Sequence, residues 1–204
     1  MVKKNMELIP HATQKIVIVI LRYAHGSPTI TILAEILGMT HVGVWKALKK
    51  LEAMDIVTLK AAGNKKNSAY TVHLKWDNPL VEKTLALALE HEAAAQRRWI
   101  INFAALEDKV DFLILYGSIL VSSKANDIDI LSVVSRRNSA MDIERAIMKV
   151  QKTQAKHIHN IICAPAGLKD ELKKPNIAFI NAVKEGVVLF GQDKFVAFMR
   201  RLHQ

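Results

Sequence analysis

The first 76 residues show apolar positions at helical spacing, followed by two short runs that are typical of strands. Residues 12–23 and 32–38 predict two helices, and in residues 41–57 the apolar positions recur at spacings of three and four. Residues 56–60 and 70–74 are rich in β-branched and aromatic side chains, and the Gly-, Asn- and Lys-rich loop between them suits a hairpin. This region is therefore predicted to form three helices followed by a β-hairpin.

Local signals predict where these helices begin and end. Thr13 and Thr40 are candidate N-caps of the first and third helices, because a threonine hydroxyl can accept a hydrogen bond from a free helical amide. Gly38 follows the last apolar residue of the second helix and is expected to end it. Thr29 and Ile30, just before the second helix, are expected to form a very short strand.

A long segment without helix breakers follows. Residues 75–79 contain Asn and Pro and predict a domain boundary, whereas Leu80–Leu106 is rich in Ala, Leu and Glu and predicts one uninterrupted helix. We expect this linker helix either to bridge two domains or to pair with its counterpart in a homodimer.

The second half of the chain contains two short apolar runs that read as buried strands. Residues 112–116 are apolar and stop at Gly117, and a second run, residues 127–131, carries two carboxylates. Side chains alternate between the two faces of a strand, so Asp127 and Asp129 are expected to share one face while the isoleucines between and after them enter the core.

Two carboxylates on one strand face point to cation chemistry. They repel each other unless a cation lies between them, and hard oxygen ligands of this kind suit Mg²⁺ held jointly by protein and phosphate. Gly117 allows the backbone to come close to a ligand, and Ser118 opens a short segment whose free amides can face a phosphate.

The order of strand, Gly-Ser turn, short helix and Asp-x-Asp strand resembles the nucleotidyltransferase superfamily of the polymerase-beta type, and in particular its minimal members. The residues are Tyr116-Gly117-Ser118, eight intervening residues, and Asp127-Ile128-Asp129, within a similarity that covers roughly residues 103–190. The resemblance implies an α/β domain with a mixed sheet. It also implies that Asp127 and Asp129 bind Mg²⁺, that Gly117 and Ser118 hold the phosphates of a nucleotide such as ATP, and that Asp127, Asp129 and Ser118 are catalytic.

The chain departs from the family pattern at two places. Residues 119–121 are apolar where the family usually has Arg and Gly, and the predicted strand over residues 156–164 lacks the family's third acid. The position expected for that acid falls near Asn160, with His159 as its neighbour, which predicts weak or absent catalysis. His157 and His159 alternate on one strand face, but without a nearby third ligand we do not expect them to form a metal site of their own.

The N-terminal order of elements resembles the winged helix-turn-helix superfamily of prokaryotic regulators. The resemblance implies that the helix predicted within residues 41–57 enters the major groove of double-stranded DNA. With the apolar stripe turned inward, the residues expected to face DNA are His41, Val42, Trp45, Lys46 and Lys49. Lys65 and Lys66 in the hairpin loop are expected to contact phosphates. Trp45 has an alternative role, which is burial against a neighbouring helix or a dimer partner.

Composition agrees with an anionic partner. The chain has 29 Lys and Arg against 19 Asp and Glu, a net charge of +10, and nucleic acid is the commonest partner of such a surface. Half of the residues are hydrophobic, which argues against disorder. The single cysteine, Cys163, has no disulfide partner, and no segment reads as a membrane span or a signal peptide. We therefore expect a cytoplasmic protein without a membrane partner.

Together these patterns predict an α+β chain of three parts. Residues 1–76 are expected to form the winged helix-turn-helix domain, residues 77–106 the linker helix, and residues 107–204 the nucleotidyltransferase-like domain. The expected function is a DNA-binding transcriptional regulator whose second domain binds Mg²⁺ and a nucleotide with weak or no catalysis. The alternative is an active Mg²⁺-dependent enzyme that transfers a nucleoside monophosphate to a hydroxyl group of a protein, a nucleic acid or a small molecule.

Overall fold

The computed structural model describes residues 10–23, 26–62, 69–122, 124–135 and 139–203. The protein is α+β, as predicted, and it separates into two compact units. The N-terminal unit comprises residues 1–88 together with His203, and the C-terminal unit comprises residues 89–202. The boundary between the units falls inside one helix, α4 (Pro79–Ala94).

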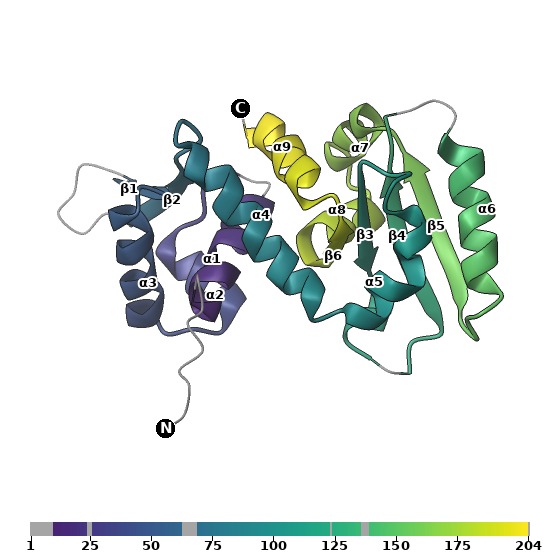
Figure 1. Ribbon diagram of the computed structural model, residues 1–204. Coiled ribbons are helices and arrows are strands. Elements are labelled where there is room, and N and C mark those ends of the chain that lie inside the picture. The colour runs from purple at the N-terminus through teal and green to yellow at the C-terminus, as the bar shows by residue number, and fades with distance from the viewer. Residues whose placement is uncertain (1–9, 24–25, 63–68, 123, 136–138, 204) are drawn as a thin grey trace, which may run out of the picture. The chain divides into compact units, whose positions relative to one another are not determined.

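The N-terminal unit contains the three helices and the hairpin that the sequence predicts (Figure 1). The helices are α1 (His11–Arg22), α2 (Ile30–Leu37) and α3 (His41–Ala53). The strands β1 (Val57–Ala61) and β2 (Tyr70–Leu74) pair antiparallel, from Val57 opposite Leu74 to Ala61 opposite Tyr70.

The core of this unit is made by one stripe of each helix and by the hairpin. Every one of its main side chains is withdrawn from solvent, which supplies the apolar burial that a short three-helix unit needs. These side chains are Ile16, Val17, Leu21, Leu33, Val44, Leu48, Leu51, Val57 and Val72.

Two of the predicted helix ends are confirmed. The Thr40 hydroxyl accepts a hydrogen bond from the backbone N–H of Gly43 at 3.1 Å, which caps α3. Gly38 adopts a left-handed conformation (φ 60°) at the end of α2, and its N–H bonds back to the helix. The turn between α2 and α3 is therefore held by a glycine at one end and a threonine cap at the other.

Two local predictions in the N-terminal unit are wrong. Thr13 is not an N-cap, because α1 begins after Pro10, whose carbonyl accepts from Gln14 N–H at 3.0 Å, and Thr13 is buried inside the helix. Ile30 is helical rather than extended. Thr29 makes one isolated bridge to Thr71, but its hydroxyl accepts from Ile32 N–H at 3.2 Å and so caps α2.

The C-terminal unit is built on a four-stranded mixed sheet in the order β5-β4-β3-β6. The strands are β3 (Phe112–Tyr116), β4 (Asp127–Val133), β5 (His157–Cys163) and β6 (Val187–Phe190). β3 pairs antiparallel with both β4 and β6, whereas β4 and β5 run parallel and are connected through a helix.

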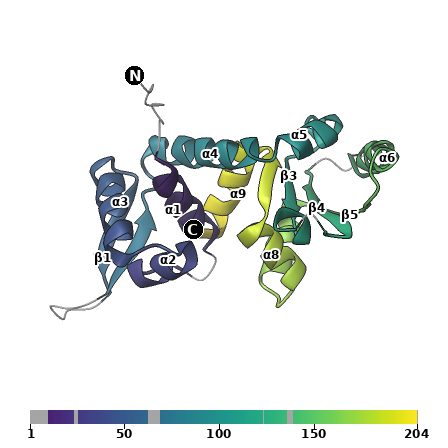
Figure 2. The same ribbon diagram turned by 90° about the horizontal axis from the view of Figure 1, so that it is seen from below.

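Helices cover both faces of this sheet (Figure 2). One face packs on α5 (Arg97–Phe103), the 3-10 helix η1 (Ala104–Leu106) and α6 (Ser139–Gln151). The opposite face packs on α8 (Ile177–Glu185) and α9 (Gln192–His203), where Phe112 meets Phe195 with ring centroids 5.4 Å apart. A further helix, α7 (Pro165–Leu172), packs beside α8.

The prediction of one uninterrupted helix over Leu80–Leu106 is wrong. α4 ends at Ala94, and a turn in which Gln96 N–H bonds to the carbonyl of Ala93 at 2.7 Å separates it from α5. The break lets Trp99 and Phe103 enter the core beside the sheet. Helix propensity is a weak preference, and here the burial of two large aromatic side chains outweighs it. Within the described part of the chain, no helix is long and apolar enough to cross a membrane.

The Thr40 cap can be tested by its contribution to stability. We expect Thr40→Ala to lower the free energy of unfolding by about 1 kcal/mol, because the Gly43 amide loses its acceptor. Thr31→Ala is the matched control, since Thr31 is exposed within α2, and it should change stability by less than about 0.5 kcal/mol. Urea unfolding of the full chain measures both values, and equal losses would contradict the assigned cap.

Candidate functional site

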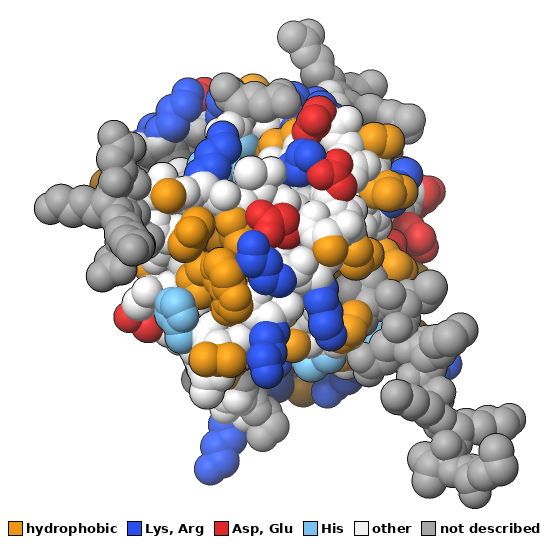
Figure 3. Space-filling model, turned by 90° about the vertical axis from the view of Figure 1, so that its left-hand side faces the viewer, with side chains coloured by type: hydrophobic (Ala, Val, Ile, Leu, Met, Phe, Trp, Pro, Cys, Tyr) orange, Lys and Arg blue, Asp and Glu red, His pale blue; other side chains and the backbone are white. Residues whose placement is uncertain are grey.

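One face of α3 is free of the core and carries the residues predicted to face DNA. Val44, Leu48 and Leu51 are fully buried, so the helix has the predicted rotation. His41, Val42, Lys46 and Lys49 are exposed, and Trp45 is half-buried. Figure 3 views this end of the molecule and shows Lys and Arg side chains around a group of hydrophobic ones.

Trp45 packs on the hairpin of its own unit. Its ring lies against Tyr70 of β2, with centroids 5.6 Å apart and a tilt of 55°. The ammonium group of Lys49 lies 4.8 Å from the centroid of the Trp45 ring, and it also donates to a carboxylate oxygen of Glu52 at 2.7 Å. This hydrogen bond lowers the pKa of Glu52. Part of the Lys49 charge is therefore already balanced inside the unit.

Lys46 differs from Lys49 in having no such partner among the described residues. It is exposed, and it makes no hydrogen bond or ion pair with another described residue. Lys65 and Lys66, the two lysines predicted to contact phosphates, lie outside the described residues. Among the described residues, α3 carries three exposed lysines, which are Lys46, Lys49 and Lys50.

The C-terminal unit brings a second set of polar side chains together on one face of its sheet. Asp129 of β4 is opposite Tyr116 of β3 and also opposite His159 of β5. Two residues earlier on both strands, Asp127 is opposite His157. Strand neighbours in register point to the same face, so the two carboxylates and two imidazoles share it. The predicted placement of Asp127 and Asp129 on one face is thus confirmed.

Core packing determines which face of the sheet carries these polar side chains. Ile128, Ile130 and Ile158 alternate with the polar residues and are buried against α5 and α6 on the opposite side of the sheet. The polar face is only partly covered, because Asp127 and Asp129 are half-buried and His157 and His159 are exposed. A ligand can therefore reach the carboxylates from solvent.

Gly117 and Asp129 are in close contact. Gly117 has φ 82° and ψ −163°, a conformation that is essentially limited to glycine. A Cβ at this position would lie 2.5 Å from Oδ2 of Asp129. Ser118 is exposed and opens the 3-10 helix η2 (Ser118–Leu120) directly after this turn. The Gly-Ser turn therefore places bare backbone beside the carboxylate of Asp129.

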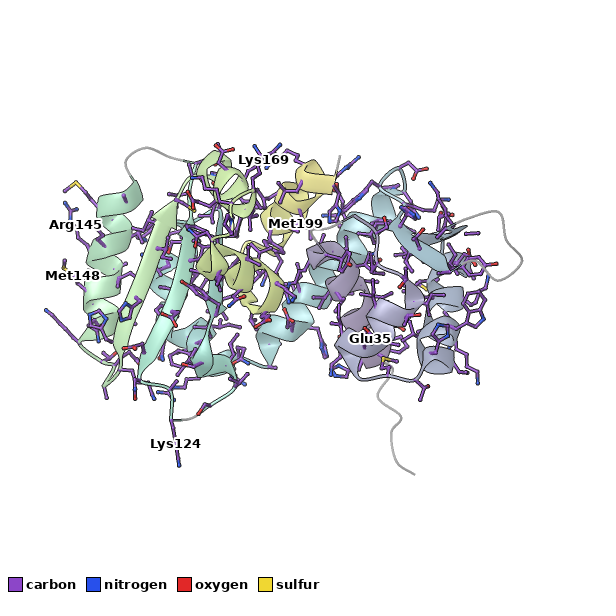
Figure 4. All side chains as sticks on the ribbon, turned by 180° about the vertical axis from the view of Figure 1, so that it is seen from behind. Glu35, Lys124, Arg145, Met148, Lys169 and Met199 are labelled. Carbon is purple, nitrogen blue, oxygen red and sulfur yellow. The ribbon has the colours of Figure 1, made fainter. Side chains whose placement is uncertain are left out.

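His159 and Asp127 form the second close pair of this face. Nε2 of His159 lies 3.5 Å from Oδ1 of Asp127, and the rings of His157 and His159 have centroids 4.6 Å apart. Burial, and secondly the negative charge of Asp129, raise the pKa of Tyr116. Lys124, in the loop between η2 and β4, points away into solvent and does not balance these carboxylates (Figure 4).

The expectation that Asn160 takes the position of a third acid is wrong. Asn160 is in register with Ile130, so it lies on the face opposite Asp127 and Asp129. Its Oδ1 accepts a hydrogen bond from the hydroxyl of Ser132 at 2.8 Å, and Ser132 is fully buried. The β5 residues that do share the face of the carboxylates include no acid. They are His157, His159, Ile161 and Cys163.

Two further observations limit the chemistry of this face. Burial raises the pKa of the Cys163 thiol to about 11, which disfavours a nucleophilic role. Among the described residues, no group of three or more His, Cys, Asp or Glu side chains is assembled to hold a metal ion. The face thus offers a pair of carboxylates and nearby imidazoles rather than a closed metal cage.

The chain matches no known family model, no curated protein and no solved structure. The interpretation of both surfaces therefore depends on their geometry.

His159 is the residue whose place beside Asp127 the sequence did not reveal. The alternation of His157, Ile158 and His159 puts both imidazoles on one face, but which face of the sheet that is depends on the pairing with β4.

The close contact at Gly117 can be tested through stability. We expect Gly117→Ala to lower the free energy of unfolding by about 1–3 kcal/mol, because the backbone conformation is strained for alanine and the new Cβ meets Asp129. Gly167→Ala is the matched control. Gly167 lies in α7 with no heavy atom closer than 4.0 Å to a new Cβ, so stability should stay the same or rise by up to about 1 kcal/mol.

Chemical unfolding of the two variants beside the parent chain measures this difference. If Gly117→Ala were as stable as Gly167→Ala, the turn would not be constrained by Asp129.

Proposed function

We propose that the chain is a DNA-binding transcriptional regulator. Residues 1–76 act as a winged helix-turn-helix domain on double-stranded DNA, residues 77–106 connect the domains, and residues 107–204 form a nucleotidyltransferase-fold domain that binds Mg²⁺ and a nucleotide. The observation that carries the DNA-binding part is the exposed face of α3, which is opposite a fully buried stripe and carries Lys46, a lysine that pairs with no other described residue.

The electrostatics of α3 support binding to a polyanion. From His41 to Leu51 the helix contains three lysines and no acidic residue, and the first acid is Glu52, which pairs with Lys49. A helix presenting its N-terminal half to the major groove would therefore bring no carboxylate close to phosphates. Lys65 and Lys66 in the hairpin loop would add contacts to phosphates without reading sequence.

The exposed side chains of α3 also suit base recognition. Lys46 can donate to the acceptor edge of guanine, and Val42, which is 62% exposed, can contact the methyl group of thymine. Trp45 is held against Tyr70 and forms a rigid apolar surface beside them. A homodimer would present two such helices to two half-sites of a palindromic operator.

The residues of the second domain fit a magnesium–nucleotide complex. Asp127 and Asp129 are two oxygen donors on one accessible face, and Gly117 leaves the backbone bare beside Asp129. Magnesium is commonly held by one or two carboxylates together with substrate phosphates, and it offsets their negative charge. Asp127 and Asp129 would hold the ion, while the amides around Ser118 would approach the phosphate oxygens.

The absence of an acid on this face of β5 supports weak or absent catalysis. The residues of β5 on this face are two histidines, an isoleucine and a cysteine, so β5 supplies no third carboxylate beside the pair. Loss of a general base typically lowers a rate by about 10²–10⁴. In this proposal the second domain senses a nucleotide rather than transferring one.

The position of His159 favours a second candidate, an active nucleotidyltransferase. An imidazole beside Asp127 could take the proton of an acceptor hydroxyl, whose oxygen attacks the α-phosphorus of a nucleoside triphosphate while pyrophosphate leaves. Release of pyrophosphate from ATP and Mg²⁺ that is lost in His159→Asn would establish this candidate over a sensor. Asn160→Asp does not test it, because Asn160 lies on the other face.

The DNA-binding proposal predicts that individual lysines contribute differently. We expect Lys46→Ala to change the ranking of sequences, with a loss of about 1–3 kcal/mol on the preferred site. Lys65→Ala and Lys66→Ala should weaken binding to all duplexes alike. Each should also reduce the slope of the logarithm of the binding constant against the logarithm of salt concentration by about one. Fluorescence anisotropy of the full chain on a selected duplex and on a scrambled one measures both effects.

The matched control is Lys152→Ala, an exposed lysine of the C-terminal unit that should leave binding unchanged. If the full chain bound no duplex at low salt, the proposed function of the first domain would be refuted.

The nucleotide proposal predicts that the two carboxylates are needed for ligand binding but not for folding. Asp127→Asn combined with Asp129→Asn should abolish Mg²⁺-dependent ATP binding measured by calorimetry. Without metal, its melting temperature should stay the same or rise, because two nearby like charges are removed. Asp142→Asn, which removes an exposed carboxylate of α6, is the control and should leave ATP binding intact. Unchanged ATP affinity in the double variant would place nucleotide binding elsewhere.

A further inference from the structure

A pocket of about 360 Å³ lies within the C-terminal unit, between the start of α7 and the end of α9. This volume is within the range of about 300–1,000 Å³ that is usual for small-molecule sites. Ser135, which follows β4, and Pro165, which follows β5, place the pocket beyond the carboxyl ends of these two parallel strands. Ligands of open α/β sheets commonly bind at that position. The pocket is therefore well placed to receive a ligand.

Two basic side chains from different helices line this pocket. They are Lys169 of α7 and Arg201 of α9, and in Figure 4 Lys169 lies between the two helices. Both are exposed, and neither makes a hydrogen bond or an ion pair with another described residue. No carboxylate is among the described residues that line the pocket. Its two positive charges are therefore not balanced by the described lining.

The two carboxylates that adjoin the lining residues each have a lysine partner of their own. Asp170, the next residue after the lysine of the pocket, pairs with Lys173 at 2.9 Å. Asp111 accepts a hydrogen bond from the hydroxyl of Ser135 and pairs with Lys194 at 3.1 Å. The basic pair of the pocket thus remains available to an anionic ligand.

The charge and geometry of these groups suit a phosphate monoester. Such a phosphate carries a charge of about −1.5 to −2 at pH 7, which two basic side chains can balance. The planar guanidinium of Arg201 can donate two hydrogen bonds to phosphate oxygens, and Lys169 adds a second charge. The first turn of α7 supports them, because its N-cap residue, Ala164, has no side chain that could cap the free amides.

Apolar side chains form the rest of the lining. Pro165 and Leu202 are half-buried, and the ring of Phe198 is buried against Phe112 with centroids 5.6 Å apart. We infer that the pocket binds a small phosphate monoester whose organic part lies on this apolar wall. The inference goes beyond the proposed function and does not depend on it, because the pocket shares no residue with α3 or with the two carboxylates of β4.

Phenyl phosphate is a suitable probe, since it joins a phosphate monoester to one apolar ring. The full chain is titrated with it by calorimetry in the presence of EDTA, so that Mg²⁺ takes no part. We expect saturable binding that is at least about tenfold tighter than that of inorganic phosphate, which has no apolar part. Benzoate, which has the same ring but a single negative charge, should also bind at least about tenfold more weakly than phenyl phosphate.

Three variants and a control identify the site. Lys169→Ala and Arg201→Ala should each weaken phenyl phosphate binding at least about tenfold, because each removes a charged donor. Arg201→Lys should restore only part of this loss, since it keeps the charge but not the two-pronged geometry. Lys152→Ala is the matched control, because it removes an exposed lysine of the same unit and should leave the affinity unchanged.

All the exchanged residues are exposed, and thermal melting checks that each variant is folded. The inference is overturned if phenyl phosphate does not bind, or if inorganic phosphate or benzoate binds as tightly as phenyl phosphate. It is also overturned if Lys152→Ala weakens the binding by the same factor as Lys169→Ala and Arg201→Ala, because the phosphate would then respond only to the net charge of the chain.

Discussion

Burial of Ile128 and Ile130 is the constraint on which the C-terminal unit depends. These side chains alternate with Asp127 and Asp129 along β4, and they are withdrawn completely from water against α5 and α6. A one-residue slip in register would expose both isoleucines and drive both carboxylates into an apolar core, where an unpaired charge is very costly. The hydrophobic effect therefore keeps the two carboxylates together on the accessible face. Their mutual repulsion is tolerated because the core leaves no alternative placement.

Strand pairing extends this constraint to β5. Because β5 runs parallel to β4 in fixed register, the same alternation that turns the carboxylates outward also turns His157 and His159 outward. Asn160 is turned inward, where the hydroxyl of buried Ser132 donates to it, so its polar side chain is satisfied without contributing to the outer face. A cation on this face would meet two carboxylates and an imidazole, which is a different donor set from three acids.

In the N-terminal unit, burial of one side of a helix, α3, determines which side chains face solvent. Val44, Leu48 and Leu51 are buried as one stripe of α3, and this leaves Val42 and Lys46 turned toward solvent. The hairpin holds Trp45 of this helix in place, because the ring of Tyr70 packs against the Trp45 ring. In both units, apolar packing on one side positions polar chemistry on the other.

The sequence by itself determined the features that depend on neighbouring residues. The alternation in β4, the stripe of α3, the cap at Thr40 and the glycine turn at Gly117 all involve residues a few positions apart, so their physical causes are local. Only the tertiary structure decided the break before α5, the inward turn of Asn160, the pairing of His159 with Asp127 and the support of Trp45 by Tyr70. These depend on side chains far apart in the chain, whose packing and strand register outweigh the weak local preferences of the segments involved.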